Sequence, residues 1–294
     1  MTRPLEPGDA DAFRSPRLLD VLIPTRNRPA ELATTLAGLA AQSGPAGFAV
    51  VVSDQSDDEP GWAAPAPAAM VRVLRHRGHP VLLTRHLPRR GLAEHRAALL
   101  ANSTARHVLL LDDDVWLEPY AVARLLTALR ELRCGFVGNA VHGLSYADDE
   151  RPEQHDGYEE WAGRPVPEDV RPGTPQWQRA RIHPAANLLH VTRKLGLAPG
   201  EWRAYKVSWI GGCVLFDRAK LVAAGGFDFW RRVPANHQGE DAAAQLAVMR
   251  RYGGAGVVPS GAYHLEAPTT VTDRGVECWQ VLLGTEPAAE GATP

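Results

Sequence analysis

The strongest constraint in this 294-residue sequence is a short apolar run at residues 108–111 (VLLL) that ends abruptly in Asp112-Asp113-Asp114. Such a run is typical of a strand buried on both faces of a parallel sheet, so the acids would lie at its carboxyl end, where open α/β sheets bind ligands. In an extended backbone Asp112 and Asp114 point the same way and Asp113 points the opposite way. Two converging carboxylates suit Mg²⁺ or Mn²⁺, whose remaining ligands are usually water and phosphate oxygens. The run therefore predicts an α/β fold that binds a phosphorylated substrate.

Two other interpretations of this acidic run remain open. The three acids could form a solvated turn before the helix that Pro119 begins, because negative charge is favourable at a helix start. The run is also similar to the Asp-x-Asp-x-Thr/Val pattern of aspartyl-phosphate phosphatases. Against that, Trp116 stands at the Thr/Val position, and the pattern normally follows a protein's first strand.

The composition is that of an ordinary soluble globular protein, with 45% hydrophobic and 22% charged residues. A formal net charge of -2 gives no reason to expect binding to nucleic acid or to anionic lipid. Three widely spaced cysteines, Cys134, Cys213 and Cys278, favour reduced thiols over a disulfide framework or a zinc site. No stretch has the character of a signal peptide or of a membrane span, so we expect a cytoplasmic protein without a transmembrane segment.

Strands alternate with helices through residue 133, which predicts a mostly parallel sheet with right-handed crossover connections. Apolar runs predict strands near residues 18–23, 48–52, 81–83, 108–111, 136–141, 207–216 and 257–258. We expect one domain over residues 17–283, between a flexible arm at 1–16 and a flexible tail at 284–294. Residues 141–206 are polar and rich in proline, so we expect an irregular insertion there.

Several short motifs occur in a fixed order along the chain. Residues 21–27 (VLIPTRN) span the end of the first predicted strand and the loop after it, and residues 53–58 (SDQSDD) follow the second strand. Gly91 and Arg96 form a Gly-x-x-x-x-Arg pattern ahead of the acidic run, which itself contains a D-x-D motif. Residues 211–212 (GG), 225–228 (GGFD) and 240–241 (ED) come later. Together, these motifs resemble family 2 glycosyltransferases of the GT-A fold.

The resemblance implies a GT-A fold, with a Rossmann-like, mostly parallel central sheet flanked by helices. Residues 17–140 would be the half that binds the nucleotide sugar, 141–206 the acceptor region and 207–283 the acceptor and catalytic half. The implied reaction is inverting transfer of a hexose from a nucleoside diphosphate sugar, most commonly a UDP-sugar, to an acceptor hydroxyl. The acceptor would be a glycan, a small molecule or a lipid-linked sugar.

The resemblance also assigns roles to individual residues. Asp112 and Asp114 would hold Mn²⁺ or Mg²⁺, with His264 as a third ligand. Asp241 would be the general base, with Glu240 as the second candidate. The other interpretation of these two acids is that they only cap the helix that starts there. The residues implied to bind the nucleotide sugar are Pro24, Thr25, Arg26, Asp54, Arg96, Asp112 and Asp113.

Two positions depart from the family pattern and leave the nucleotide base open. Ser53 stands where the family often has Asp, and Gln55 where it often has Gly. Two other functions also remain possible. One is a nucleotidyltransferase that makes a nucleotide sugar, although the chain lacks an early Gly-rich loop. The other is a non-catalytic protein that binds nucleotide sugars, which would show metal-dependent binding without turnover.

Overall fold

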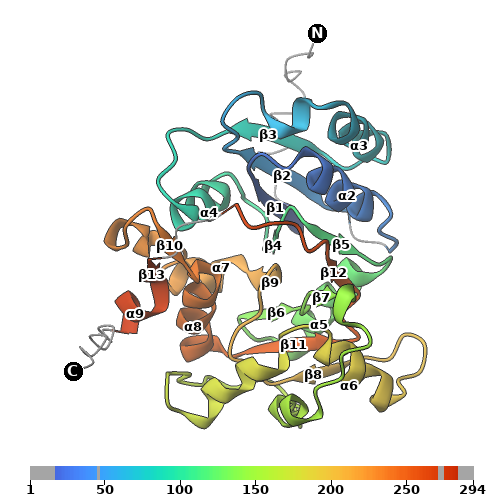
Figure 1. The fold of residues 1–294 in the computed structure, drawn as a ribbon, viewed down its shortest axis with the longest axis vertical. Helices are drawn as coiled ribbons and strands as arrows, with labels where there is room; N and C mark the ends of the chain where they lie inside the picture. The colour runs from blue at the N-terminus through green and yellow to red at the C-terminus, as the bar shows by residue number, and fades with distance from the viewer. Residues whose placement is uncertain (1–16, 45–46, 271–274, 284–294) are drawn as a thin grey trace, which may run out of the picture.

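The computed structural model describes residues 17–44, 47–270 and 275–283. In these residues eight strands form one central sheet of order β3-β2-β1-β4-β9-β6-β11-β8, which runs from top to bottom in Figure 1. The arm and the tail expected at residues 1–16 and 284–294 lie outside the described residues. The strands of the sheet are β1 (Leu19–Thr25), β2 (Ala49–Asp54), β3 (Val81–Arg85), β4 (His107–Leu111), β6 (Phe136–Gly138), β8 (Arg203–Tyr205), β9 (Cys213–Asp217) and β11 (Gly254–Val258).

Helices cover both faces of this sheet. One face is packed by apolar residues of α2, α3 and α5, and the other by those of α4, α6, α7 and α8. β1 shows why both faces are apolar, because Leu19, Val21 and Ile23 enter the first core and Leu22 enters the second. The helices are α2 (Pro29–Ala40), α3 (Pro65–His76), α4 (Leu92–Ala101), α5 (Ala121–Leu132), α6 (Asn187–Leu195), α7 (Arg218–Ala223), α8 (Glu240–Tyr252) and α9 (Cys278–Leu283).

The predicted mostly parallel sheet is confirmed, with two reversed strands. β1 pairs in parallel with β2 and β4, and β2 with β3, whereas β9 pairs antiparallel with β4 and β6, and β8 antiparallel with β11. The strand predicted at 207–216 is shorter than expected, because β9 begins only after the Gly211-Gly212 turn. Since β9 runs in reverse, this turn lies beside the end of β4, and Asp112 N donates to Gly212 O at 2.9 Å.

Two small sheets place further residues near that edge. β12 (Ala262–His264) pairs with β5 (Val115–Leu117) and β7 (His142–Gly143), and the register sets His264 opposite Val115. β10 (His237–Gln238) pairs with β13 (Val276–Glu277). Both sheets bring residues from late in the chain to the ends of β1 and β4.

The segment expected to be an irregular insertion is partly ordered into helices. It contains α6 and three 3₁₀ helices, Leu144–Tyr146, Pro152–Gly157 and Pro175–Ile182. The segment is not a loose loop, because Leu188 and Val191 of α6 and Ile182 enter the second core. No helix within the described residues is long and apolar enough to cross a membrane.

A buried threonine of α2 fixes the backbone that follows β4. Thr35 Oγ1 donates to Asp113 O at 2.7 Å and accepts from Val115 N at 3.2 Å. Thr35 is fully buried, so neither backbone group can turn to water instead. The side chain therefore acts as a bridge across the acidic segment.

We expect Thr35→Val to lower the free energy of unfolding by about 2 kcal/mol, because the isosteric side chain leaves a buried N–H and a buried C=O without partners. Urea unfolding would measure the change. Thr34→Val is the matched control, since the Thr34 hydroxyl is exposed and bonds to Ala30 O within the same helix. A similar loss in both variants would show that the Thr35 bridge contributes nothing specific.

Candidate functional site

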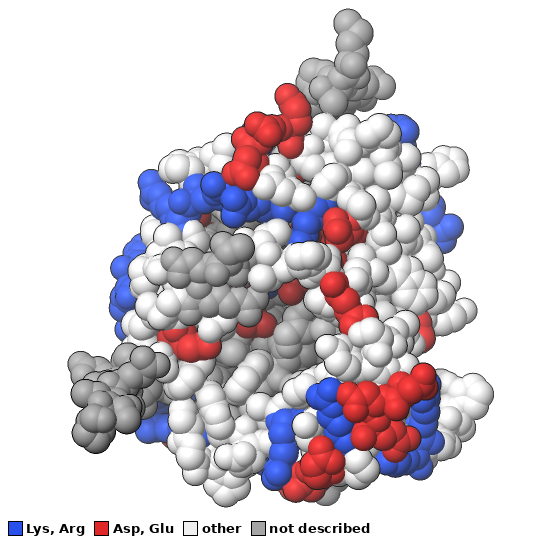
Figure 2. Space-filling view, in the orientation of Figure 1, with Lys and Arg blue, Asp and Glu red and all other residues white. Residues whose placement is uncertain are grey.

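A cleft of 630 Å³ opens at the carboxyl ends of β1, β2 and β4. In Figure 2 basic side chains form a band across the upper part of the molecule, and acidic side chains are visible in the hollow below it. Most of the predicted site residues line this cleft, namely Pro24, Thr25, Arg26, Asp112, Asp113, Asp114 and His264. Among the described residues, the cleft lining does not include Asp54, Glu240, Arg96 or Asp241. Arg96 and Asp241 instead line a smaller cavity, which Asp112 also lines.

Asp112, Asp113 and Asp114, hereafter the acidic turn, do not alternate as a strand would. The backbone turns at Asp113 and Asp114, so the expectation that Asp113 points away from Asp114 is wrong. Arg28 Nη1 instead lies 3.1 Å from Asp113 Oδ1 and 2.7 Å from Asp114 Oδ2. Thr25 Oγ1 also donates to Asp113 Oδ2 at 2.7 Å. The turn thus directs two neighbouring carboxylates to one guanidinium.

Two carboxylates of the acidic turn, those of Asp113 and Asp114, have raised pKa values. Burial raises the pKa of Asp113 to about 7, in spite of the hydrogen bond from Thr25. Burial and the nearby charge of Asp112 also raise the pKa of Asp114. Cations beside the turn are therefore needed to keep these groups negative.

Arg96 joins the acidic turn to the start of α8. Its Nη2 lies 2.8 Å from Asp112 Oδ1, and its Nε lies 2.8 Å from Glu240 Oε1. Burial alone would lower the pKa of Arg96, but the two carboxylates raise it above its usual value. Glu240 is itself buried, so its carboxylate is a fixed partner of Arg96.

Asp241, in the first turn of α8, lies near Asp112 across the glycine pair. A Cβ added at Gly211 would lie 3.8 Å from Asp241 Oδ2, and one added at Gly212 would lie 3.5 Å from Asp112 Oδ2. Gly212 also has a φ of +76°, which favours glycine. Burial and the neighbouring charge of Glu240 raise the pKa of Asp241 to about 7. A carboxyl group with this pKa can accept a proton near neutral pH.

His264 reaches the acidic turn with its Nε2 atom, 3.4 Å from Asp114 Oδ2. Its Nδ1 accepts from Glu266 N at 2.9 Å, so in the neutral ring the proton is assigned to Nε2. As placed, His264 offers Asp114 a donor and has no free lone pair for a metal. In the part of the chain that the structure describes, no three His, Cys, Asp or Glu side chains are arranged around one point as metal ligands.

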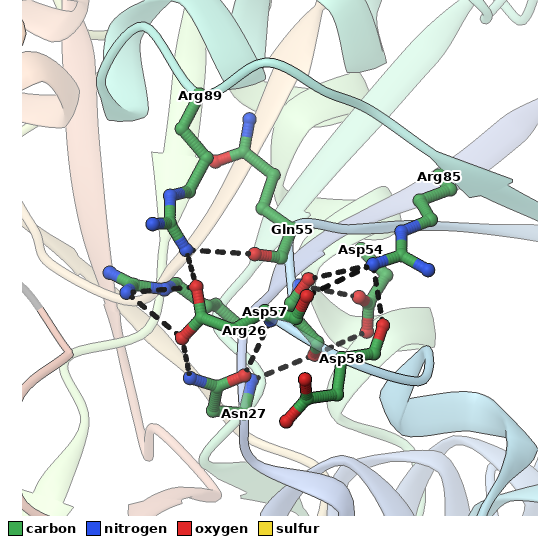
Figure 3. A network of polar contacts seen from close by, with 9 residues as sticks. Arg26, Asn27, Asp54, Gln55, Asp57, Asp58, Arg85 and Arg89 are labelled. Atoms are coloured by element: carbon green, nitrogen blue, oxygen red, sulfur yellow. Dashed lines mark hydrogen bonds and ion pairs between the residues drawn. The ribbon is translucent and has the colours of Figure 1, made fainter.

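The rim of the cleft is held by a network centred on Asp57, drawn in Figure 3. Asn27 donates from Nδ2 to Asp57 Oδ2 at 2.6 Å and accepts from Asp57 N at 3.0 Å. Asn27 has a φ of +55°, a conformation that Asn tolerates better than most residues. Arg26 and Arg89 form ion pairs with the same carboxylate. Two guanidinium groups are therefore fixed at the rim of the cleft.

Asp54, which was predicted to bind the nucleotide, does not line the cleft, whereas Gln55, to which no role was assigned, does. Asp54 is fully buried, and its carboxylate accepts hydrogen bonds from Ser56 N at 2.7 Å and Gly61 N at 2.8 Å. Gln55 lines the cleft, is 6% exposed, and its Nε2 atom has no hydrogen-bond partner among the described residues. The Asp54 carboxylate thus holds the loop after β2, whereas Gln55 lies at the wall of the cleft with a buried amide nitrogen that has no partner among the described residues.

Gly91 is required by a close contact at the other side of the cleft. With a φ of +97°, it lies where an added Cβ would be 2.4 Å from His237 Cε1 and 2.8 Å from Ala235 O. His237 Nε2 accepts from Ala93 N at 2.9 Å, so its Nδ1 donates to Pro234 O. Because the glycine of the Gly-x-x-x-x-Arg pattern has no side chain, β10 can pack against the start of α4.

Sequence reasoning assigned no site role to Arg28, Arg89 or His237, which all line the cleft. A signal for Arg28 was present, because three consecutive acids at a buried strand end need cations nearby. Arg89 and His237 lie in loops whose course the sequence pattern does not reveal. Only the folded structure shows that Arg89 and His237 line the cleft.

Comparisons with known proteins identify the family. The profile of glycosyl transferase family 2 matches residues 20–190, more than half of the chain. A solved structure of S. aureus TarS has a TM-score of 0.51 at 16% identity, covering 85% of this chain and 37% of that chain. The structure of S. aureus TarS 1-349 in complex with UDP-GlcNAc also has a TM-score of 0.51, at 14% identity, covering 86% of this chain and 60% of that chain.

The chain thus spans less than two thirds of either TarS structure. No curated protein sequence matches it. At these identities the TarS structures show a shared fold, and the matched profile shows the family. The chain belongs to glycosyl transferase family 2 and has the GT-A fold.

Proposed function

We propose that this protein transfers a sugar from a nucleoside diphosphate sugar to an acceptor hydroxyl, with inversion at the anomeric carbon. One observation carries the proposal: the acidic turn at the donor cleft and the carboxyl of Asp241 meet across the Gly211-Gly212 turn. The acidic turn would bind the diphosphate side of the donor, and Asp241 would contact the attacking hydroxyl. The family match over residues 20–190 supports sugar transfer as the reaction.

The nucleotide would lie along the ends of β1 and β2. Pro24, Thr25, Arg26, Gln55 and Arg89 line that part of the cleft. A planar guanidinium stacks on bases and pairs with phosphate, so Arg26 and Arg89 suit a nucleotide. We propose UDP as the first nucleotide to test, since TarS 1-349, which has a similar fold, was solved with UDP-GlcNAc.

A divalent ion, Mn²⁺ or Mg²⁺, would be held by Asp112 and Asp114, whose oxygens suit such ions. When bound, it would neutralise the charge that develops on the leaving diphosphate. His264 could join as a ligand after giving up its hydrogen bond from Glu266 N. Arg28 already contacts Asp114, so the ion and this guanidinium would share one carboxylate.

Asp241 is the proposed general base. As the acceptor oxygen bonds to the anomeric carbon, the bond to the diphosphate breaks and the hydroxyl proton passes to Asp241. Glu240 is less suited, because its carboxylate is paired with Arg96. Arg96 would hold Glu240 and Asp112 in place on either side of the reaction.

We expect Asp241→Asn to reduce turnover of the sugar donor by a factor of about 100 or more while leaving donor binding intact, because the amide cannot accept the proton. Steady-state kinetics and calorimetric nucleotide binding would measure the two effects. Asp114→Ala should weaken both. Asp228→Asn is the control, since the Asp228 carboxylate is exposed and forms an ion pair with Arg231 in a surface turn. Near-normal turnover of the Asp241 variant would refute the assignment of the base.

The pH dependence of kcat/KM should reflect Asp241. Because its pKa is raised to about 7, it is protonated below that pH, so kcat/KM should rise as the pH increases to about 7 and then level off. Asp113 has a similar pKa but lies in the donor cleft. Nucleotide affinity over the same range would separate the two groups: a rise that appears equally in affinity would assign the profile to Asp113.

We expect Gln55→Leu to weaken nucleotide binding by about threefold to tenfold, because the wall of the cleft then loses the Gln55 amide as a hydrogen-bonding partner for the base. Binding of inorganic pyrophosphate should be unchanged, since it has no base. Calorimetric titrations of UDP, GDP and CDP against both proteins would show whether the loss depends on the base. Equal losses for every nucleotide and for pyrophosphate would contradict a role in reading the base.

A further inference from the structure

Arg28 directs its guanidinium into the acidic turn. Its Nη1 contacts Asp113 Oδ1 and Asp114 Oδ2, and its Nη2 donates to Pro268 O. The three side chains are largely buried, with 12% of Arg28, 7% of Asp113 and 5% of Asp114 exposed. Contacts between ionised groups in such a setting are little screened by solvent.

Two arginines pair with four of the carboxylates at this end of the sheet. Arg96 lies between Asp112 and Glu240, and Arg28 takes the other two carboxylates of the acidic turn. Without Arg28, two buried carboxylates would face each other with Thr25 and His264 as their remaining side-chain contacts. Leaving buried like charges unpaired is costly, so a cation is required here whether or not a metal is present.

Arg28 contacts Asp114 Oδ2, an oxygen of the carboxylate that is proposed to bind the metal. Asp114 Oδ2 receives Arg28 Nη1 at 2.7 Å and faces His264 Nε2 at 3.4 Å. Both neighbours present N–H groups, because His264 Nδ1 is already an acceptor. In this arrangement Asp114 is surrounded by donors and not by further ligands.

We propose that Arg28 is the resident cation of the acidic turn and that a divalent ion displaces it from Asp114. Arg28 keeps its contact with Asp113, so the displaced guanidinium stays in the cleft. There it gains free N–H groups that suit an anion such as the diphosphate of the donor. The proposal rests on the proposed function for the identity of the ion and of that anion.

The test is a titration of the donor-free protein with Mn²⁺, in which electron paramagnetic resonance measures the free ion. Arg28→Gln removes the competing cation, so its Mn²⁺ dissociation constant should be lower than that of the unmodified protein by about tenfold or more. Arg26→Gln is the matched control. It removes the same charge from the same loop, but Arg26 pairs with Asp57 at the rim, so its dissociation constant should change less than about twofold.

Arg28→Lys adds a second comparison that preserves the charge. Lysine offers a single compact ammonium and cannot hold both carboxylates as the planar guanidinium does. The Mn²⁺ affinity of Arg28→Lys should therefore fall between those of the unmodified protein and Arg28→Gln. Circular dichroism would establish that each variant is folded. If Arg28→Gln does not fold, the order of the lysine variant and the unmodified protein still decides the question.

Equal or weaker Mn²⁺ binding by Arg28→Gln would overturn the proposal, and so would the same gain in Arg26→Gln. Absence of Mn²⁺ binding in every variant would also overturn it. These outcomes are separate from failure of the proposed function, which would appear as no binding or turnover of any nucleotide sugar. If the protein turns over UDP-sugars and all variants bind Mn²⁺ with the same affinity, the proposed function stands. The proposal that the ion displaces Arg28 is then wrong.

Discussion

Neutralising buried carboxylates is the requirement on which this site depends. β4 ends in three acids, and α8 begins with two more, close enough that Asp112 raises the pKa of both Asp114 and Asp241. Arg96 from α4 and Arg28 at the start of α2 pair with four of these five carboxylates. Arg96 bridges carboxylates of the acidic turn and of α8, and Arg28 ties the start of α2 to the acidic turn, so the contacts that set the charge of the cleft also join α2, α4, β4 and α8.

The reversed strand β9 builds the second side of the site. A parallel strand at that position would enter the sheet at the opposite edge, far from the acidic turn. Because β9 is antiparallel, the chain arrives at the ligand edge through a glycine pair, which lies against Asp112 and Asp241 without side chains of its own. The base candidate and the donor cleft are thereby brought together from residues more than one hundred positions apart.

Much of the scaffold could be predicted from the sequence, because buried strands and amphipathic helices follow apolar patterns. The first four strands lie close to their expected positions, and helices begin near Pro119 and at Glu240 as predicted. Asp217 caps α7, accepting from Lys220 N. The family resemblance is confirmed by the matched profile.

The details of the site could not be predicted, since they depend on how loops turn. The alternation expected for the acids failed because Thr35 holds the backbone in a turn at Asp113. Asp54 was proposed as a ligand contact, but the loop after β2 folds back on its carboxylate, and Gln55 lines the cleft instead. α6 was missed because its short apolar stripe lies among polar residues. The proposed roles of Asp241, of the metal ligands and of the nucleotide contacts stay predictions.

The continuous central sheet limits how this protein can move around a substrate. β9, from the later part of the chain, is hydrogen-bonded between β4 and β6, so no flexible linker separates the two sides of the cleft. Rotating one side against the other as a rigid body would break ladder hydrogen bonds. Opening and closing must then come from the segments at the cleft mouth, such as residues 234–238 and 265–270, while the sheet stays still.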